Sequence, residues 1–366
     1  MIIGIDTRIA LKKKTGIGYL ISNLIPMLVE IDDEINFKLL GDSLGISQKN
    51  VKAIHLRGIV KRGFNFWWKT FGFPPANILT GRSDKFLFTN FVDFPVKTKE
   101  RTLLVPDLSF VKYPEFVEKK NLKFLNNVAR SIKRADKIIT ISESTKKEIV
   151  DYYNIKSEKV NVVYLAASQG IMRISDQKRI QATRNKYGIK NKYILFVGTT
   201  EPRKNIGNLI RAYNELGDSL KKQYMLVIAG GRSRYGDDPL DLVKRLNLSK
   251  RIIFTGYLDE AGLSCVYSGA SAFVFPSLYE GFGIPVLESF KCEIPVAASF
   301  SSSIPEVGGD AALYFDPQNI DDMKEKIQCV LRDEKLRHEM IEKGHEQLKR
   351  FSWEKAAERT LEVLLK

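Results

Sequence analysis

One stretch constrains the fold of this chain more than any other: residues 273–291, which read FVFPSLYEGFGIPVLESFK. Its apolar start predicts a short strand at Ala272–Phe275, and a turn with Gly281 and Gly283 follows. Pro285 suits the first position of a helix that extends to about Lys291, because proline lacks the backbone N–H that has no partner there. A strand that leads through glycines into a helix presents unpaired N–H groups and the positive end of the helix dipole. The stretch therefore predicts an anion-binding site.

Two carboxylates flank this junction. Glu280 lies in the loop before the helix, and Glu288 lies about one turn inside it. Carboxylates are poor ligands for phosphate but good acceptors for sugar hydroxyls, so a pocket that combines them with amides suggests a nucleotide sugar. Two glutamates at this spacing are common in proteins. The pair becomes informative only together with the strand, the glycines and the proline.

Taken together, these residues resemble the E-x7-E signature of the GT4 family of retaining glycosyltransferases. The resemblance implies an α/β chain with the GT-B fold, in which two Rossmann-like parallel-sheet domains face a cleft and a last helix crosses back to the first domain. It also implies that Glu280 contacts the donor sugar, assisted by the backbone amides of Phe282, Gly283 and Ile284. Glu288 is the residue implied to hold the ribose hydroxyls.

The length of the chain favours two domains, because 366 residues exceed the usual size of a single core. We expect an acceptor-binding domain at residues 1–170, a nucleotide-sugar-binding domain at residues 171–350 and a helix at residues 351–366 that packs on the first domain. No run of 18 apolar residues predicts a transmembrane helix, and the first residues do not have the pattern of a signal peptide. A cytoplasmic location is therefore expected.

The metal-ligating residue types are few and scattered. Cys265, Cys292 and Cys329 have no metal-type spacing and are interpreted as reduced cytosolic thiols. The chain has only 3 histidines, and no cluster of histidine and cysteine predicts a zinc site. Since no Asp-x-Asp motif stands at a strand end, we expect no metal requirement and no cofactor other than the nucleotide-sugar donor.

The chain is basic, with a net charge of +15 that is concentrated in residues 1–170. Such an excess suits nucleic acid, an anionic membrane surface or a phosphate-bearing substrate, and no nucleic-acid motif supports the first option. Residues 62–75 combine Trp67 and Trp68 with basic side chains. This segment could lie at a membrane interface, but such rings also pack the interior of a domain, and both interpretations stay open.

The N-terminus resembles the opening of a nucleotide-binding fold. A strand is expected at residues 2–6, a loop with Gly16 and Gly18 follows, and residues 19–31 have the apolar period of a helix. The loop lacks the third glycine of the dinucleotide fingerprint. In the GT4 resemblance, Gly16 and Gly18 face the donor phosphates.

A second strand, loop and helix follow a polar stretch at residues 167–191, which we interpret as the linker. Arg203 and Lys204 lie where the second loop enters its helix, and two such cations can neutralise a diphosphate without a metal. An Arg-Lys pair alone is more often a solvated loop feature, but this pair follows a buried strand. Many GT4 chains have an arginine where this chain has Thr199, and the Arg-Lys arrangement resembles a subgroup with polysaccharide mannosyltransferases.

Short apolar runs alternate with helical patterns along both halves, which predicts parallel sheets covered by helices. Further strands are expected at residues 37–40, 51–55, 86–89, 102–105, 137–142, 160–164, 193–197, 224–229, 251–255 and 295–298. Gly230 follows one of these strands, and Gly256 and Tyr257 follow another. The resemblance places these strand ends along the nucleotide pocket, with the second near the base.

The chain departs from the family pattern at one position. GT4 enzymes commonly have a histidine before an Asp-Leu-Ser sequence, and this chain has Pro106 there, followed by Asp107. Since the family histidine reaches the donor sugar, the departure puts the efficiency of transfer in doubt. Asp107 is kept as a catalytic candidate, and Asn90 and Asp93 are candidates to line the sugar side.

The sequence as a whole is interpreted as a retaining hexosyltransferase. The resemblance favours GDP-mannose as donor and a saccharide or lipid-linked saccharide acceptor in surface polysaccharide synthesis, with contact at the inner face of the membrane. Three alternatives stay open: transfer from a UDP-sugar, a non-catalytic sugar-nucleotide-binding subunit, and a nicotinamide-dependent oxidoreductase. The last requires the complete glycine fingerprint that the first loop lacks.

Overall fold

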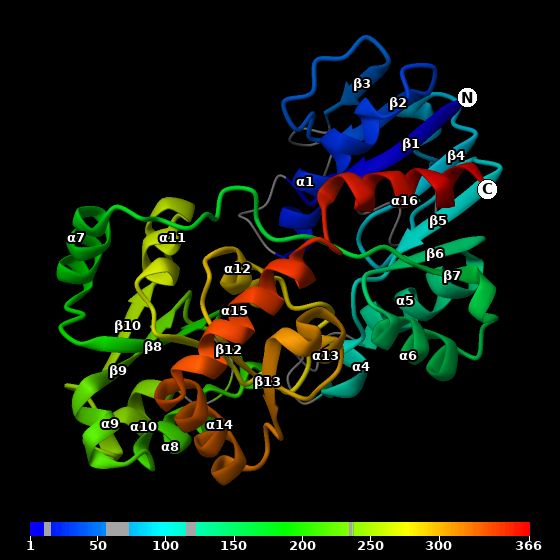
Figure 1. Ribbon diagram of the computed structural model, residues 1–366. Coiled ribbons are helices and arrows are strands. Elements are labelled where there is room, and N and C mark those ends of the chain that lie inside the picture. The colour runs from blue at the N-terminus through cyan, green and yellow to red at the C-terminus, as the bar shows by residue number, and fades with distance from the viewer. Residues whose placement is uncertain (11–15, 56–72, 115–121, 234–235, 237) are drawn as a thin grey trace. The chain divides into compact units, whose positions relative to one another are not determined.

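Figure 1 shows the computed structural model, which describes residues 1–10, 16–55, 73–114, 122–233, 236 and 238–366. The chain divides into two compact units. The first contains Met1–Val111, Val117–Leu165 and Trp353–Lys366, and the second contains Lys112–Phe116 and Ala166–Ser352.

The boundary between the units lies at Leu165, earlier than the expected residue 170. The segment after it packs on the second unit, because Met172 N donates to Ser264 Oγ at 3.2 Å and Ile174 N donates to Ser268 Oγ at 2.8 Å. Closer to the boundary, Lys291 Nζ donates to Ser168 O at 2.9 Å, which attaches residues 166–170 to the second unit.

The first unit is built on a sheet of seven parallel strands in the order β3-β2-β1-β4-β5-β6-β7. Its strands are β1 (Ile2–Thr7), β2 (Asn36–Gly41), β3 (Val51–Ile54), β4 (Lys85–Phe88), β5 (Glu100–Leu104), β6 (Lys137–Thr140) and β7 (Val160–Val162). Phe86, Phe88 and Phe94 form an aromatic cluster with ring centroids 4.7–5.6 Å apart. Successive residues of β1, β4 and β6 are buried, so both faces of the sheet are covered along these strands.

Helices of the first unit come from both ends of the chain. They are α1 (Gly16–Glu30), α3 (Asn77–Thr80), α4 (Ser109–Lys112), α5 (Leu122–Arg134), α6 (Glu143–Tyr153) and α16 (Trp353–Leu365). The rings of Tyr19 in α1 and Trp353 in α16 meet edge to face at 6.2 Å, and Lys85 Nζ donates to Leu365 O at 3.2 Å. The return of the last helix to the first domain is therefore confirmed (Figure 1).

The start of α1 corrects one expectation. The helix begins at Gly16, so Gly16 and Gly18 lie in its first turn and not in a preceding loop. The apolar face extends to Ile17, which packs against the core of the first unit, and this contact favours the earlier start.

The second unit contains six parallel strands in the order β10-β9-β8-β11-β12-β13. They are β8 (Lys192–Val197), β9 (Tyr224–Ala229), β10 (Ile252–Gly256), β11 (Ala272–Phe275), β12 (Val296–Ser299) and β13 (Ala312–Phe315). Their helices are α7 (Gln177–Tyr187), α8 (Ile206–Asn214), α9 (Asp218–Gln223), α10 (Pro239–Arg245), α11 (Glu260–Ser268), α12 (Ile284–Lys291), α13 (Ile304–Gly308), α14 (Ile320–Arg332) and α15 (Glu334–Leu348). The chain order of the strands reverses between β8 and β11, and open α/β sheets commonly bind ligands at the carboxyl ends of the strands at such a switch point.

Helix α7 and strand β13 are among the elements of the second unit that were not expected. Helix α7 lies in the stretch interpreted as a linker, with Asp176 as its N-cap and Gly188 in left-handed conformation at its C-terminus. Strand β13 pairs with β12 in parallel register at the edge of the sheet.

The proposed membrane-interface residues Trp67 and Trp68 lie outside the described residues. Among the helices that the structure does describe, none is long and apolar enough to cross a membrane.

Candidate active site

The carboxyl ends of three adjacent strands in the second unit meet at glycines. Gly198 N donates to Ala229 O at 2.9 Å, and Gly230 N donates to Gly256 O at 2.9 Å. Gly230 has a φ of +145°, and a Cβ added there would lie 2.0 Å from Gly198 O. Only glycine fits this close backbone approach, which exposes the strand ends beside the switch point.

The two loops that flank the switch point are held together by one side-chain and one backbone hydrogen bond. After β8, Pro202–Lys204 forms a short 3-10 turn, and Asn205 takes a left-handed conformation with φ of 57° before α8 begins. Asn205 Nδ2 donates to Pro276 O at 3.1 Å, and Leu278 N donates to Arg203 O at 2.8 Å. The loop after β8 is thereby fixed against the loop after β11.

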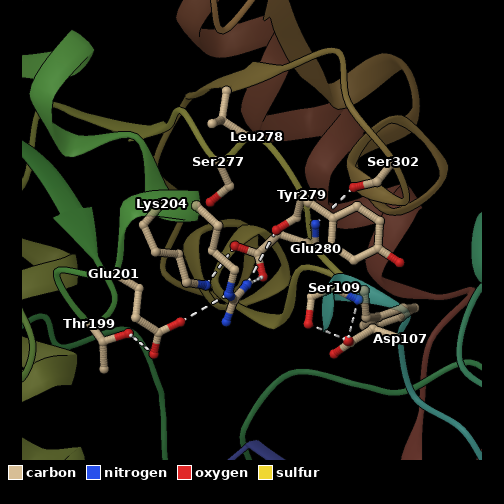
Figure 2. A network of polar contacts seen from close by, with 12 residues as sticks. Asp107, Ser109, Thr199, Glu201, Lys204, Ser277, Leu278, Tyr279, Glu280 and Ser302 are labelled. Atoms are coloured by element: carbon tan, nitrogen blue, oxygen red, sulfur yellow. Dashed lines mark hydrogen bonds and ion pairs between the residues drawn. The ribbon is translucent and has the colours of Figure 1, made fainter. Parts of the chain in front are cut away.

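These contacts bring Arg203, Lys204 and Glu280 together, as Figure 2 shows for Lys204 and Glu280. Lys204 Nζ donates to Glu280 Oε1 at 2.5 Å, and Arg203 Nη1 donates to Glu280 Oε2 at 3.0 Å. Arg203 also contacts Glu201, with Nε donating to Oε2 at 2.9 Å. Lys204 and Glu280 are each only 8% exposed, so these charges interact in a largely dry environment.

The cluster of Arg203, Lys204 and Glu280 stabilises the ionised form of the Glu280 carboxyl group. Burial raises the pKa of Glu280, but the charges of Lys204 and Arg203 outweigh it and bring the pKa to about 2. Burial also lowers the pKa of Lys204, and the nearby Glu280 carboxylate opposes this shift. The result is a carboxylate that can accept hydroxyl hydrogen bonds beside two cations that can contact an anionic group.

Serines after β12 hold the backbone of the Glu280 loop. Ser302 Oγ accepts from Glu280 N at 2.9 Å (Figure 2), and Ser303 Oγ lies 2.9 Å from Glu280 O and 2.7 Å from Phe282 O. The sequence did not identify these serines as part of the site, because no spacing connects them with Glu280. Their contacts show that they position the carboxylate through its backbone.

The start of α12 is one residue earlier than expected, since Ile284 takes the first helical position and Pro285 the second. Gly283 is the N-cap with φ of 124°, and Ile284 and Pro285 follow in the first turn. The Phe282 side chain is 3% exposed and its ring meets Phe351 at 5.7 Å. Its ring therefore belongs to the core, and only its backbone is a candidate for ligand contact.

Glu288 has a different environment from Glu280. It is 7% exposed in α12, and Tyr267 Oη donates to its Oε2 at 2.9 Å. Burial raises the pKa of Glu288 to about 7, although the hydrogen bond from Tyr267 opposes the shift. A carboxyl group near its pKa at neutral pH can accept or donate a hydrogen bond.

The strand-end residues Thr199, Thr200 and Tyr257 lie at the same edge of the sheet. Thr199 Oγ1 donates to Glu201 Oε1 at 2.8 Å, and Thr200 Oγ1 accepts from Ser233 N at 2.9 Å. Tyr257 follows β10 and is 72% exposed. Its ring is therefore accessible to a ligand.

The remaining candidates belong to the first unit. Asp107 Oδ1 accepts from Ser109 N at 2.9 Å and Ser109 Oγ at 2.7 Å, contacts that hold the start of α4. Asp93 is engaged by Arg101 Nη1 at 3.1 Å and Ser131 Oγ at 2.8 Å. Both aspartates thus have structural contacts within this unit. Within the described ranges, no group of three or more His, Cys, Asp or Glu side chains is arranged to hold a metal.

Comparison with known proteins identifies the family. The family described as "Glycosyl transferases group 1" matches residues 179–347, which lie within the second unit. The O-antigen chain mannosyltransferase B of Escherichia coli is 33% identical over 70% of this chain and 67% of that protein. The serotype-specific mannosyltransferase WbdA of Escherichia coli is 33% identical over 71% of this chain, which spans only 32% of that protein.

A solved structure shows the same fold across the chain. Sucrose-phosphate synthase from Thermosynechococcus elongatus superposes on this chain with a TM-score of 0.75 at 18% identity. The superposition covers 99% of this chain and 98% of the synthase chain. The resemblance seen in the residues around Glu280 and Glu288 is thereby confirmed at the level of family and fold. The chain belongs to the group 1 glycosyl transferases and has the GT-B fold.

Proposed function

We propose that the protein is a retaining hexosyltransferase that transfers mannose from GDP-mannose to a saccharide or lipid-linked saccharide acceptor in surface polysaccharide synthesis. The observation that carries the proposal is the ionised Glu280 held between Arg203 and Lys204 at the switch point of the second sheet. Support for mannose comes from the relatives, which are named as mannosyltransferases.

The chemistry assigned to the cluster follows from its charges. Glu280 accepts hydroxyls of the donor sugar, and Arg203 and Lys204 neutralise the departing diphosphate. As the acceptor oxygen bonds to the anomeric carbon, the bond to the diphosphate breaks on the same face, and the acceptor proton moves to the departing phosphate oxygen. Preorganised charges act most on developing charge, so losing one such contact costs about 3–4 kcal/mol, or about 10²–10³ in rate.

The nucleotide is assigned to the strand ends and to Glu288. The Glu288 carboxyl holds the ribose hydroxyls, while Gly230, Gly256 and Tyr257 line the nucleotide pocket, with Gly256 and Tyr257 near the base. GDP is favoured over UDP because the Arg203–Lys204 loop resembles that of polysaccharide mannosyltransferases. UDP-sugar transfer is the alternative within the same enzyme class.

Metal independence is part of the proposal. Two cations beside the leaving group supply the charge that a divalent ion supplies in other transferases. Transfer in 5 mM EDTA should therefore equal transfer in Mg²⁺. Loss of activity in EDTA that Mg²⁺ restores refutes this part.

The first unit is assigned to the acceptor. Asp107 is its catalytic candidate, and Gly16 and Gly18 are assigned to the donor phosphates. The basic composition of residues 1–170 suits a lipid-diphosphate-linked acceptor at the inner face of the membrane.

Peripheral membrane contact is tested by flotation with anionic liposomes. Flotation of the wild type that Trp67→Ser/Trp68→Ser reduces supports it, and unchanged flotation refutes the role of the two tryptophans.

The decisive experiment separates binding from turnover. Calorimetric titration with GDP, UDP and NAD identifies the nucleotide, and transfer from radiolabelled GDP-mannose to α-mannosides measures activity. Glu280→Gln should lower transfer about 10²–10³-fold and change GDP affinity little. The control Glu215→Gln alters a surface carboxylate 3.9 Å from Lys324 and should change neither.

Each alternative has its own outcome in this experiment. Preference for UDP keeps the enzyme class and overturns the donor, and binding of NAD without GDP or UDP overturns the proposal. A second candidate, a non-catalytic sugar-nucleotide-binding subunit, is favoured by Pro106 in place of the family histidine. Tight GDP binding without transfer by the wild type supports that candidate.

A further inference from the structure

A hollow of about 560 Å³ opens in the second unit, beside the carboxyl ends of β12 and β13. Its aromatic lining comes from Tyr113, Phe300 and Tyr314, and its polar lining includes Asp316 and Gln318. None of the residues to which we assign donor binding lines it. It is therefore a separate feature of the unit.

Phe300 is an exposed ring in a fixed position. It is 68% exposed, although burying a phenylalanine normally contributes substantially to stability. Its N donates to Phe315 O at 2.8 Å, which continues the pairing of β12 with β13, and its ring meets Tyr314 edge to face at 5.6 Å. The Tyr314 hydroxyl donates to Gly309 O at 2.8 Å. The strand pairing and the second ring hold Phe300 as an accessible flat platform.

One wall of the hollow, which includes Leu278 and Pro317, is attached to the loops that carry Arg203, Lys204 and Glu280. Leu278 lines the hollow and lies two positions before Glu280 on one loop (Figure 2). Pro317 also lines the hollow, and its carbonyl accepts from Asn205 Nδ2 at 2.7 Å. Since Asn205 directly follows Lys204, this wall is fixed to the loops of the proposed transfer site.

The charges around the hollow disfavour an anionic ligand. Among the described residues that line it, the ionisable groups are two tyrosines and the carboxyls of Asp316 and Asp322, with no lysine, arginine or histidine. Asp322 is engaged internally, because its Oδ2 accepts from Asp316 N at 2.7 Å and its Oδ1 lies 3.7 Å from Lys326 Nζ. Asp316 uses Oδ1 for Gln318 N at 2.9 Å, and a carboxylate has capacity for further hydrogen bonds.

We propose that this hollow is a saccharide-binding subsite that holds sugar units of the acceptor away from the reacting end. The C–H bonds of a pyranose face carry a small positive charge that suits the negative face of Phe300. Sugar hydroxyls donate to Asp316 and bond with the amide of Gln318. A neutral polyol matches a site with aromatic rings, acceptors and no cations, whereas a phosphate does not.

The role as an acceptor subsite rests on the proposed function, but saccharide binding itself is tested without transfer. Saturation-transfer NMR of the full chain with α-linked mannotetraose, maltotetraose and chitotetraose detects weak binding. At least one saccharide should bind, and Phe300→Ala should weaken its binding about five- to tenfold, the size of a lost aromatic contact. Phe300→Tyr retains the ring and should bind within about twofold. The control Tyr152→Ala removes a ring that is 62% exposed in the first unit and should leave binding unchanged.

A transfer assay then tests the role in catalysis. With mannotetraose as acceptor, Phe300→Ala should raise KM about five- to tenfold and leave kcat and GDP affinity unchanged. With methyl α-mannoside, too short to reach the subsite, the variant should behave as the wild type.

The outcomes distinguish this proposal from the proposed function. If GDP binds but none of the saccharides does, or if Phe300→Ala binds them normally, the subsite is refuted and the proposed function stands. If saccharides bind through Phe300 but GDP and transfer are absent, the proposed function is refuted and the subsite stands as a binding site.

Discussion

Replacing Glu288 with glutamine should change stability in a strongly pH-dependent way. Burial raises the pKa of this carboxyl from its ordinary value of 4.5 to about 7. At about 1.4 kcal/mol per pKa unit, the fold bears a cost of about 3 kcal/mol once Glu288 is fully ionised. Only 7% of the residue is exposed, so solvent screens this cost little.

The sign follows from the direction of the shift. Because the folded-state pKa is above the unfolded value, the contribution of Glu288 is fully present below about pH 4.5 and is lost as the pH rises through 7. Glutamine has the shape of the protonated carboxyl but stays neutral. Glu288→Gln should therefore be close to the wild type at pH 5 and gain about 2–3 kcal/mol relative to it by pH 8.

The assay is urea-induced unfolding of both proteins at pH 5, 6, 7 and 8, followed by circular dichroism. Tyr267→Phe is the matched control with the opposite sign, because it removes the hydrogen bond that Tyr267 Oη donates to Glu288. This variant should lose more stability at pH 8 than at pH 5. A difference between Glu288→Gln and the wild type that is the same at every pH refutes the raised pKa.

The raised pKa of Glu288 predicts that protons are released on nucleotide binding, if Glu288 holds the ribose hydroxyls as a carboxylate. At pH 6 the group is largely protonated in the free protein, so GDP binding should release protons. Titrations in buffers of different ionisation enthalpy measure this release, and Glu288→Gln should abolish it. A wild type that releases no protons while binding GDP contradicts the assigned contact.

Two further predictions concern the frame of the site. Gly230→Ala should destabilise the protein by about 2–4 kcal/mol, because its Cβ would lie 2.0 Å from Gly198 O at a φ of +145°. The control is Gly231→Ala, whose Cβ would meet nothing within 4 Å and which should be neutral. Equal thermal stability of the two variants contradicts the close approach. Lys204→Met should cost about 3–5 kcal/mol by leaving buried Glu280 with fewer charged partners, and Lys204→Met/Glu280→Gln should cost less than the sum of the single changes. Additive costs in denaturant unfolding contradict a direct Lys204–Glu280 interaction.

Much of the fold was predictable because many of its strands are short apolar runs, and β8, β9 and β10 lead directly to glycines. The expected strand at residues 224–229 coincides with β9, Tyr224–Ala229, which is buried along its whole length and followed by Gly230. Helix α7 was missed because Ile180 is its only buried residue, so it carries no apolar period. Strand β13 was missed because it is short and mostly half-buried at the sheet edge.

The composition of the site was less predictable than its motifs. The sequence identified Arg203, Lys204 and Glu280 separately, and it assigned the cations to a diphosphate rather than to the glutamate. Their contact depends on β11 pairing with β8, although β10 precedes β11 in the chain. The periodicity of apolar residues predicts strands and helices, but it does not predict the order of the strands in the sheet. Ser302 and Ser303 were missed for the same reason, since they reach Glu280 from the loop after the neighbouring strand β12.

The two glutamates of one motif show why spacing alone does not determine chemistry. Both side chains are almost fully buried, yet cations bring the pKa of Glu280 to about 2 while burial raises that of Glu288 to about 7. The stability that Glu280 contributes is present above about pH 4.5 and is lost as the pH falls through 2, whereas that of Glu288 is lost as the pH rises through 7. At neutral pH, Glu280 is therefore a permanent acceptor, while the pKa of Glu288 lies close to the pH of the solution. The pKa values of the two glutamates differ because Arg203 and Lys204, on a different loop, contact Glu280. That contact exists only in the folded chain, so the sequence motif alone does not predict the difference.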